Sequence, residues 1–333
     1  MTEVFKNNLV SIIIPVYNFD FLLLEQCINS CACQTYKNIE ILIMANGVTD
    51  ETYKQILYYE QTDKRIKVIR CKKKGVSNAR NEGMRLSKGK YIAFIDADDY
   101  LEDNYIEKMI VPDADITACS FYKEYSFRKG KNIITKEQKP KTKEEFITDL
   151  LNFQKAVGCV WGKLFNAEYL KENNIFFDEE LNLAEDADFV LRGIKYNNPK
   201  IIYIPEMLYH YTFSQHSVVR NFNEKYCESY RKALKKIEYL IDKKKYLTQW
   251  NNFVAHHLLL ICVNYCFNSE NRISYNGRKQ ILKEILKDEL FAKCLNLYSL
   301  KDFPLSKKIS LFFLKHGIVF VVYIISIIRN NMR

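Results

Sequence analysis

The sequence YIAFIDADD, at residues 91–99, joins an almost wholly apolar run to three closely spaced carboxylates. The apolar part, residues 91–95, is typical of a strand that is covered on both faces, as in a parallel sheet. In open α/β sheets, ligands bind outside the carboxyl ends of the strands, which is where Asp96, Asp98 and Asp99 fall. These nine residues therefore predict a buried parallel sheet and a site at its edge.

The chain on either side of this stretch alternates short apolar strands with helical patterns. Strands are predicted at residues 10–14, 39–44, 66–70, 91–95 and 116–122, and helices at residues 21–33 and 77–87. This alternation indicates βαβ units and a mostly parallel sheet. The basic run at residues 128–131 is predicted to be a turn. Thr142 and Glu145 fit a capping box that opens a further helix ending near residue 153.

The length and charge of the chain limit its organisation and its partners. With 333 residues and 48% apolar content, it can bury an α/β core and still form a second unit of about a hundred residues. We expect an α/β domain at residues 1–220, a helical appendage at 221–305 and a basic tail at 306–333. The formal net charge of +10 suits an acidic partner, which includes nucleic acid, anionic lipid and phosphorylated small molecules.

The ten cysteines contain no Cys-x-x-Cys pair. Cys27, Cys31 and Cys33 are the densest group, and their apolar setting without a nearby histidine favours thiols in a helix core over a metal site. Residues 1–10 lack the apolar stretch that a signal peptide needs. We therefore expect a cytoplasmic protein without disulfides.

Carboxylates as crowded as those at residues 96–99 repel one another unless a cation neutralises them. A Mn²⁺ or Mg²⁺ ion that bridges them to a substrate diphosphate is the simplest arrangement. A solvated acidic turn is the alternative interpretation, and the apolar strand before the cluster favours the ion. A phosphatase with an aspartate nucleophile is disfavoured, because Asp99 is not followed by the hydroxyl pattern of that class.

Three further motifs lie at or near the predicted strand ends. Pro15 is predicted to end the first strand, and the ring of Tyr17 beyond it could stack on a base. The second strand runs into the turn sequence NGVTD at residues 46–50. The third motif, GVSNARN at residues 75–81, opens the helix that precedes residues 91–99.

In this order and spacing, the motifs resemble those of the family-2 glycosyltransferases over residues 8–215. The resemblance implies an α/β, GT-A-type fold with a mostly parallel central sheet flanked by helices and a C-terminal helical appendage. It also implies that residues 1–220 bind a nucleotide sugar and carry the catalytic groups.

The resemblance implies roles on the donor side. The uracil and ribose would be held by Pro15, Val16, Tyr17 and Asn46, the diphosphate by Arg80, and the ribose or sugar by Asp96 and Ala97. The metal would be held by Asp98 first, with Asp96, Asp99 and His216 as further candidates. The family commonly has Asp-Asp-Gly-Ser where this chain has Ala-Asn-Gly-Val at residues 45–48, so an amide that can both donate and accept replaces a carboxylate.

On the acceptor side, the resemblance implies that Asp186 is the catalytic base and that Glu185 orients it or binds an acceptor hydroxyl. Such a base is needed, because the attacking hydroxyl must lose its proton. A favourable interaction with a helix dipole is the structural alternative for this pair. Trp161 and Lys163 resemble the segment that lines the acceptor cleft, although Trp161 equally suits a core position.

Residues 306–333 carry five Lys or Arg side chains and no acidic residue around two apolar runs. Because Lys315 and His316 interrupt the apolar stretch, an interfacial helix on an anionic membrane is favoured over a membrane span. A helix packed on the catalytic domain is the structural alternative. The predicted location is therefore peripheral, on the inner face of the cytoplasmic membrane.

Together these features predict a metal-dependent, inverting hexosyl- or N-acetylhexosaminyltransferase that uses a UDP-sugar, as in bacterial surface polysaccharide synthesis. Its acceptor would be a glycan or a lipid-linked glycan, with no nucleic acid as partner, and the sequence is compatible with a homo-oligomer. One alternative is a polyprenyl-phosphate glycosyltransferase, which would need no base to deprotonate a hydroxyl. The other is a catalytically silent glycan- or nucleotide-binding subunit, suggested by the altered residues 45 and 46.

Overall fold

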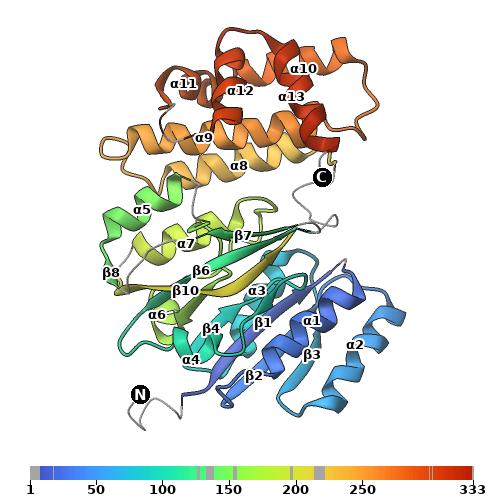
Figure 1. Cartoon of the computed structure of the whole chain (residues 1–333), viewed down its shortest axis with the longest axis vertical. Helices are drawn as coiled ribbons and strands as arrows, with labels where there is room; N and C mark the ends of the chain where they lie inside the picture. The colour runs from blue at the N-terminus through green and yellow to red at the C-terminus, as the bar shows by residue number, and fades with distance from the viewer. Residues whose placement is uncertain are drawn as a thin grey trace. The chain divides into compact units, whose positions relative to one another are not determined.

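The chain forms two compact units in a computed structural model (Figure 1). The structure describes residues 8–17, 19–125, 128–132, 139–152, 156–195, 198–213, 222–299, 301 and 303–331. The first unit comprises Met1–Phe146 and Gly158–Ser214, and the second Ile147–Val157 and Gln215–Arg333. The predicted domain boundary at residue 220 lies outside the described residues.

A single mixed sheet forms the centre of the first unit, with described strands in the order β3-β2-β1-β4-β9-β6-β10-β5; β7 pairs with β6, and β8 with β10. The strands are β1 (Val10–Val16), β2 (Ile39–Ala45), β3 (Ile66–Arg70), β4 (Tyr91–Phe94), β5 (Tyr100–Leu101), β6 (Ile116–Tyr125), β7 (Arg128–Asn132), β8 (Lys139–Lys141), β9 (Lys163–Asn166) and β10 (Ile201–Thr212). The longest pairings, β1 with β2 and β6 with β10, are parallel. The predicted α/β class with a mostly parallel sheet is confirmed.

Helices flank this sheet (Figure 1). They are α1 (Phe21–Ala32), α2 (Asp50–Thr62), α3 (Val76–Leu86), α4 (Tyr105–Met109), α5 (Lys143–Leu151, which continues into the second unit), α6 (Ala167–Glu172) and α7 (Glu185–Lys195). The predicted helices at residues 21–33 and 77–87 are confirmed as α1 and α3. The sequence pattern did not indicate α2, because Ile56 is the one side chain of α2 that is buried.

The missing N–H of Pro15 predicts that the first strand ends at this residue. This prediction is wrong, because β1 continues to Val16. Pro15 pairs with Met44 in the parallel register of β1 and β2. On its other side, the pairing of β1 with β4 stops at Ile13 and Phe94. Backbone N–H and C=O groups point to alternate sides along a strand, so those of Pro15 point to the same side as those of Ile13. On that side, Pro15 lies beyond the end of β4. Its missing N–H therefore breaks no ladder hydrogen bond.

The predicted turn at residues 128–131 is also wrong, because these residues belong to β7, antiparallel to β6. The Nζ atom of Lys129 lies 3.2 Å from a carboxylate oxygen of Glu124 and 3.8 Å from the ring centroid of Tyr122. A strand stabilised by cross-strand charge and ring contacts has no apolar run to reveal it in the sequence.

The predicted capping box is confirmed, and the prediction of thiols in a helix core is confirmed for two of the three cysteines. Thr142 N donates to Glu145 Oε2 at 3.0 Å and Glu145 N donates to Thr142 Oγ1 at 3.2 Å, which is the reciprocal pattern of a capping box. Cys27 and Cys31 are buried thiols of α1, while Cys33 is exposed at its C-terminal end. The packing of α1 on the sheet therefore accounts for two of the three clustered cysteines.

The second unit is helical. Its helices are α8 (Tyr226–Glu238), α9 (Leu247–Ile261), continued by the π-helical segment η2 (Cys262–Cys266), α10 (Tyr275–Lys287), α11 (Glu289–Leu297), α12 (Leu305–Lys315) and α13 (Val319–Asn331). The predicted tail contributes to this core, since Leu311, Leu314 and Val322 are buried. None of the described helices has both the length and the apolar character needed to cross a bilayer.

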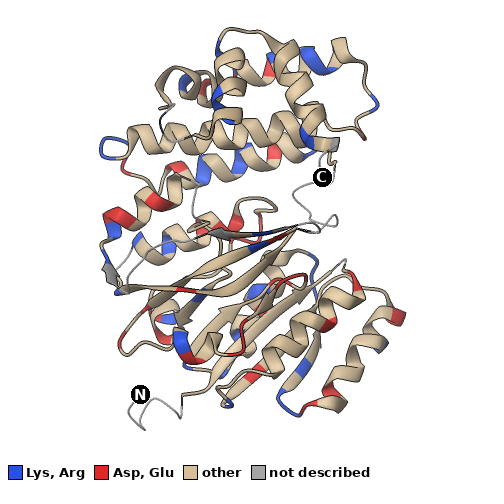
Figure 2. Ribbon diagram, viewed as in Figure 1, with Lys and Arg blue, Asp and Glu red and all other residues tan. Residues whose placement is uncertain are grey.

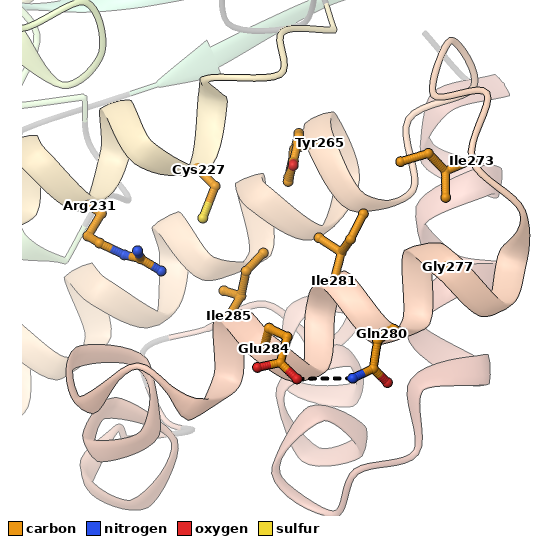
Figure 3. A pocket seen from close by; sticks show the side chains of 9 residues that line it. All are labelled: Cys227, Arg231, Tyr265, Ile273, Gly277, Gln280, Ile281, Glu284 and Ile285. Carbon is orange, nitrogen blue, oxygen red and sulfur yellow. Dashed lines mark hydrogen bonds between the residues drawn. The ribbon is translucent and has the colours of Figure 1, made fainter.

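A largely apolar cavity of about 490 Å³ lies among α8, η2 and α10 (Figure 3). Its apolar wall includes Tyr265, Ile281 and Ile285. Arg231 also lines the cavity, but its Nε lies 3.0 Å from an Asp288 carboxylate oxygen, so its charge is already paired.

We predict that Gly89→Ala destabilises the first unit by about 1–3 kcal/mol. A Cβ on Gly89 would lie 2.6 Å from the backbone nitrogen of Ser11, so β1 and the start of β4 would have to separate. Gly130→Ala is the control, because its Cβ would meet no atom closer than 3.7 Å, and we expect a change within about 0.5 kcal/mol.

The measurement is urea unfolding followed by tryptophan fluorescence. The chain has two tryptophans, Trp161 in the first unit and Trp250 in the second, so a Trp250→Phe background makes the signal report on the first unit. Equal midpoints for the two glycine variants would show that the close approach at Gly89 carries no constraint.

Candidate functional site

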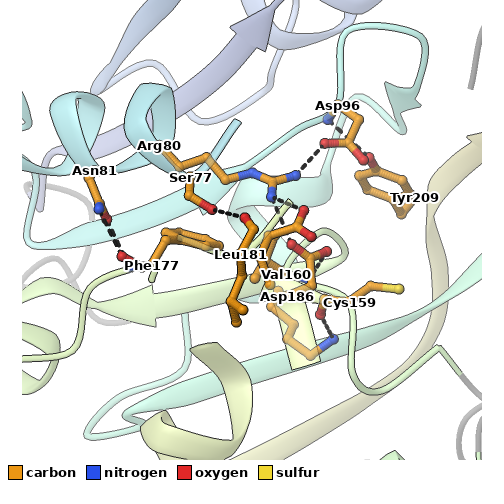
Figure 4. Close-up of polar contacts among 12 residues, drawn as sticks. Ser77, Arg80, Asn81, Asp96, Cys159, Val160, Phe177, Leu181, Asp186 and Tyr209 are labelled. Carbon is orange, nitrogen blue, oxygen red and sulfur yellow. Dashed lines mark hydrogen bonds and ion pairs between the residues drawn. The ribbon is translucent and has the colours of Figure 1, made fainter. Parts of the chain in front are cut away.

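One buried guanidinium joins the motifs that the sequence analysis singled out separately (Figure 4). Arg80 Nη2 lies 2.9 Å from Asp96 Oδ1, at the end of β4. Arg80 Nη1 lies 2.7 Å from Asp186 Oδ1 and 3.3 Å from Glu185 Oε1, at the start of α7. The helix α3 therefore carries a cation that holds the predicted donor side and the predicted acceptor side together.

The position of Arg80 depends on how α3 begins. Gly75 precedes the helix with φ +118°, a conformation that favours glycine. Its N–H donates to Asn46 Oδ1 at 2.8 Å, while Asn46 Nδ2 donates to the Lys73 carbonyl at 2.7 Å. The end of β2 thus clamps the loop from which α3 starts, and the clamp fixes where Arg80 points.

The Arg80 guanidinium is charged despite its burial. Burial by itself lowers its pKa, but the charges of Asp186, Asp96 and Glu185 outweigh this effect and raise the pKa above its usual value. The guanidinium carbon also lies 5.2 Å from the ring centroid of Phe177, at cation–π distance. Arg80 is therefore a permanent positive charge at the site.

Glu185 and Asp186 occupy the first turn of α7, where a favourable interaction with the helix dipole also applies. Asp186 Oδ2 accepts a hydrogen bond from Val160 N at 3.2 Å. Burial, followed by the charge of Asp186, raises the pKa of Glu185 to about 7. Burial also raises the pKa of Asp186, against the opposing charge of Arg80. The pair therefore includes a carboxyl that exchanges a proton near neutral pH.

In the aspartate cluster, Asp99 is buried and both of its oxygens are engaged. Tyr209 Oη donates to Oδ2 at 2.6 Å and Thr212 N donates to Oδ1 at 2.7 Å. Burial, then the charges of Asp98 and Asp96, raises the pKa of Asp99. These contacts favour Asp99 as a support of the loop, with Asp96 and Asp98 as the half-buried carboxylates of the cluster.

Two carboxylates together with substrate phosphate oxygens suit Mg²⁺ or Mn²⁺, which seldom rely on protein ligands alone. Asp96 and Asp98 fit this requirement. Within the described ranges, no three His, Cys, Asp or Glu side chains are arranged to hold an ion by themselves. His216, the remaining candidate ligand, lies outside the described residues.

The four residues predicted to hold the uracil and ribose differ in exposure. Tyr17 is 57% exposed, and Gly47 lets its ring approach the backbone, since a Cβ there would lie 3.2 Å from a ring carbon. Val16 is buried and Pro15 half-buried, and Asn46 is buried with its amide already bonded within the chain. Tyr17 is therefore the residue of the four that offers an exposed side chain to a base.

The two predicted acceptor residues are both buried. Trp161 stacks on Tyr209 and Tyr211 with ring centroids 4.9 Å and 5.3 Å apart. Lys163 donates from Nζ to the Cys159 carbonyl at 2.6 Å, and burial lowers its pKa to about 8. Both side chains thus contact other residues of the protein, and their role in binding an acceptor stays a prediction.

Residues 11–173 match the protein family described as Glycosyl transferase family 2. Residues 11–173 therefore belong to this family. EpsJ of Bacillus subtilis, named an uncharacterized glycosyltransferase, is 32% identical over 63% of this chain, which spans 62% of EpsJ. EpsH of the same organism, a putative glycosyltransferase by name, is 26% identical over 93% of this chain and 92% of its own length.

Solved structures of GT-A type share the fold. A crystal structure of S. aureus TarS is 18% identical, with a TM-score of 0.62 over 97% of this chain and 92% of that chain. The mannosyltransferase PcManGT of Pyrobaculum calidifontis, in complex with GDP-Man and Mn²⁺, is 14% identical with a TM-score of 0.52 over 96% of this chain and 86% of its own. At these identities, the likeness establishes the fold.

Sequence analysis of this family 2 chain missed a cluster around His210 in β10. The His210 ring stacks between Tyr100 and Tyr122, with centroids 4.0 Å and 4.7 Å away. Its Nε2 lies 2.9 Å from Glu102 Oε1 and its Nδ1 lies 2.7 Å from Glu124 Oε1. The available signal was the alternation of side chains along a strand, which places His210 on the opposite face of β10 from its sequence neighbours Tyr209 and Tyr211.

We predict that Arg80→Gln lowers the free energy of unfolding of the first unit by about 3–5 kcal/mol at pH 8. Without the cation, the pKa values of Glu185 and Asp186, which burial already raises, rise further above their unfolded values. Their contribution to stability is then present at low pH and lost as pH rises through the folded pKa. The deficit relative to wild type should therefore shrink at pH 5.

Arg85→Gln is the matched control in the same helix. Arg85 is exposed and lies 3.5 Å from a Glu179 oxygen, so we expect a change below about 1 kcal/mol at either pH. Urea unfolding in the Trp250→Phe background measures both variants. A deficit for Arg80→Gln that does not vary with pH would contradict the charge argument.

Proposed function

We propose that this family 2 protein is an inverting glycosyltransferase that moves a sugar from a UDP-sugar to a hydroxyl of a glycan or lipid-linked glycan. The observation that carries the proposal is the Arg80 guanidinium, which joins Asp96 to Asp186 and Glu185. Donor-side and acceptor-side carboxylates are thereby held within one hydrogen-bond network. TarS, which shares the fold, has a structure in complex with UDP-GlcNAc, and this supports uracil as the base.

Asp186 is the proposed base. Hydrogen bonds from Arg80 and from the backbone of Val160 orient its two oxygens, and each oxygen keeps a lone pair for a further donor. Its raised pKa makes it a stronger base than an exposed aspartate. The acceptor hydroxyl gives its proton to Asp186 as its oxygen bonds to the anomeric carbon. The bond to the diphosphate breaks with its electron pair on the leaving oxygen, and attack from the opposite face inverts the centre.

Asp96 and Asp98 are the proposed holders of Mn²⁺ or Mg²⁺. A bound ion would stabilise the charge that develops on the diphosphate by several kcal/mol. Mn²⁺ is present in the PcManGT complex, which has the same fold. Arg80 is buried among carboxylates, so we assign it a positioning role that reaches the diphosphate through Asp96.

We further propose that the acceptor is presented at the inner face of the cytoplasmic membrane, as in synthesis of bacterial surface polysaccharides. EpsH, which is similar over 93% of this chain, is a putative glycosyltransferase of a bacterium. The basic, apolar C-terminal segment supports this location, because it combines groups that favour anionic lipid with side chains that favour its apolar interior.

The donor is tested with purified protein, Mn²⁺ or Mg²⁺ and a panel of nucleotide sugars. We expect release of UDP from one or a few UDP-sugars, loss of release with EDTA, and none from GDP- or CMP-sugars. Release of no nucleotide from any donor would favour a silent binding subunit instead.

The base is tested with Asp186→Asn. We expect kcat for transfer to fall by roughly 10²–10⁴, because the amide cannot take the proton, while the KM for the donor stays close to that of wild type. Glu172→Gln, an exposed carboxylate of α6, is the control and should leave kcat unchanged. Near-wild-type transfer by Asp186→Asn would instead support a phosphate acceptor.

A further inference from the structure

Large apolar side chains are exposed along the last two helices of the second unit. We call this set the apolar ridge, and its members are between 39% and 72% exposed: Leu305, Ile309, Phe312, Ile318, Phe320, Ile324 and Ile328. Large apolar side chains that are exposed repeatedly along two packed helices indicate an interaction site, whereas single exposed apolar residues do not.

The ridge follows from the helical repeat of α12 and α13. In α12, residues 305, 309 and 312 are spaced by four and three positions, so they share one face, while Leu311 and Leu314 are buried on the other. In α13, residues 320, 324 and 328 share a face in the same way, while Val319 and Val322 are buried. Each helix thus packs one apolar face inward and presents a second apolar face outward.

The two helices form an antiparallel hairpin. Gly317 has φ +70° in the connection, a conformation that favours glycine. Arg329 Nη2 donates to Ser306 Oγ at 3.1 Å, which brings the end of α13 beside the start of α12. Both outward faces therefore belong to one helical hairpin rather than to two separate segments.

The charge on this hairpin has one sign. Residues 304–333 contain no acidic residue, and Figure 2 accordingly has no red on α12 or α13. Lys308 and Lys315 lie four residues before and three residues after Phe312, so they flank the ridge on α12. Within the described part of the chain, neither has a carboxylate within ion-pair distance.

We propose that the apolar ridge is a docking surface for an anionic lipid bilayer. Its Phe, Leu and Ile side chains enter the boundary between headgroups and acyl chains, and Lys308 and Lys315 contact the lipid phosphates. An outward apolar face flanked by lysines is the pattern of interfacial helices. A second copy of the chain fits less well, because it would bring the same unpaired lysines together.

This inference deepens the proposed function, since it names the surface that holds the protein where a lipid-linked acceptor lies. It rests on the membrane part of that proposal alone. The chemistry of Asp186 and Asp96 does not depend on it, so the two can fail separately.

The test is co-sedimentation of the full chain with phosphatidylcholine vesicles, with and without 30% phosphatidylglycerol, a composition chosen as roughly that of an anionic leaflet. We expect the protein to bind the mixed vesicles and to lose at least about tenfold in partitioning when Phe312, Phe320 and Ile324 are all changed to Ser. Changing Lys308 and Lys315 to Gln should cost about fivefold for each lysine, only on the mixed vesicles.

Matched controls use exposed side chains of the same unit outside the ridge. Tyr239→Ser with Leu247→Ser removes comparable apolar area, and Lys244→Gln with Lys283→Gln removes equal charge; neither should change partitioning. Circular dichroism checks that each variant is folded, and UDP release without vesicles should match wild type. Absence of vesicle binding, equal loss in controls and ridge variants, or a dimer that only the ridge variants abolish would overturn the proposal.

Discussion

The site depends on a balance of charge that no single residue of it could maintain. A buried arginine is costly without partners, and several buried carboxylates are costly without a cation. Arg80 and its three acidic neighbours meet both requirements, and in doing so they fix α3, the end of β4 and the start of α7 against one another. Three carboxylates exceed one guanidinium, and Asp98 adds a fourth nearby. The excess negative charge is what a divalent cation and its diphosphate can share.

Strand β10 organises the site from its other side. Tyr209 and Thr212 hold the buried Asp99, whereas His210 binds Glu102, just beyond β5, and Glu124 at the end of β6. The aspartate loop is therefore fixed both at its carboxylates and through the strand that follows it. Asp96 and Asp98 are the half-buried carboxylates of the loop, whereas both oxygens of the buried Asp99 accept hydrogen bonds from β10.

The sequence predicted those elements of the fold that depend on residues close together in the chain. Apolar runs revealed five of the strands, β1, β2, β3, β4 and β6, and the capping box revealed the start of α5. Prediction from the sequence failed where the cause is distant: Pro15 stays in β1 because β4 has already ended, and β7 forms because β6 supplies charge and ring contacts. Two of the partners of Arg80, Glu185 and Asp186, lie more than a hundred positions away in the sequence. The resemblance to a family suggested a contact with the diphosphate for Arg80, whereas in the structure its guanidinium contacts three carboxylates. The sequence also gave no sign that the Asn46 amide bonds to Lys73 and Gly75, because only the folded chain brings that loop beside the end of β2.

Asn46 has a consequence for how the two halves of the site respond to acid. Its amide does not ionise, so the clamp that holds the start of α3 keeps the same hydrogen bonds at any physiological pH. The Glu185 carboxyl, in contrast, takes up a proton near pH 7. Acidification therefore reaches Glu185 on the acceptor side while the Asn46 clamp at the start of α3 is unaffected. A carboxylate in place of Asn46 would have added a titratable group to this clamp, whereas the amide keeps the hydrogen bonds that position α3 independent of pH.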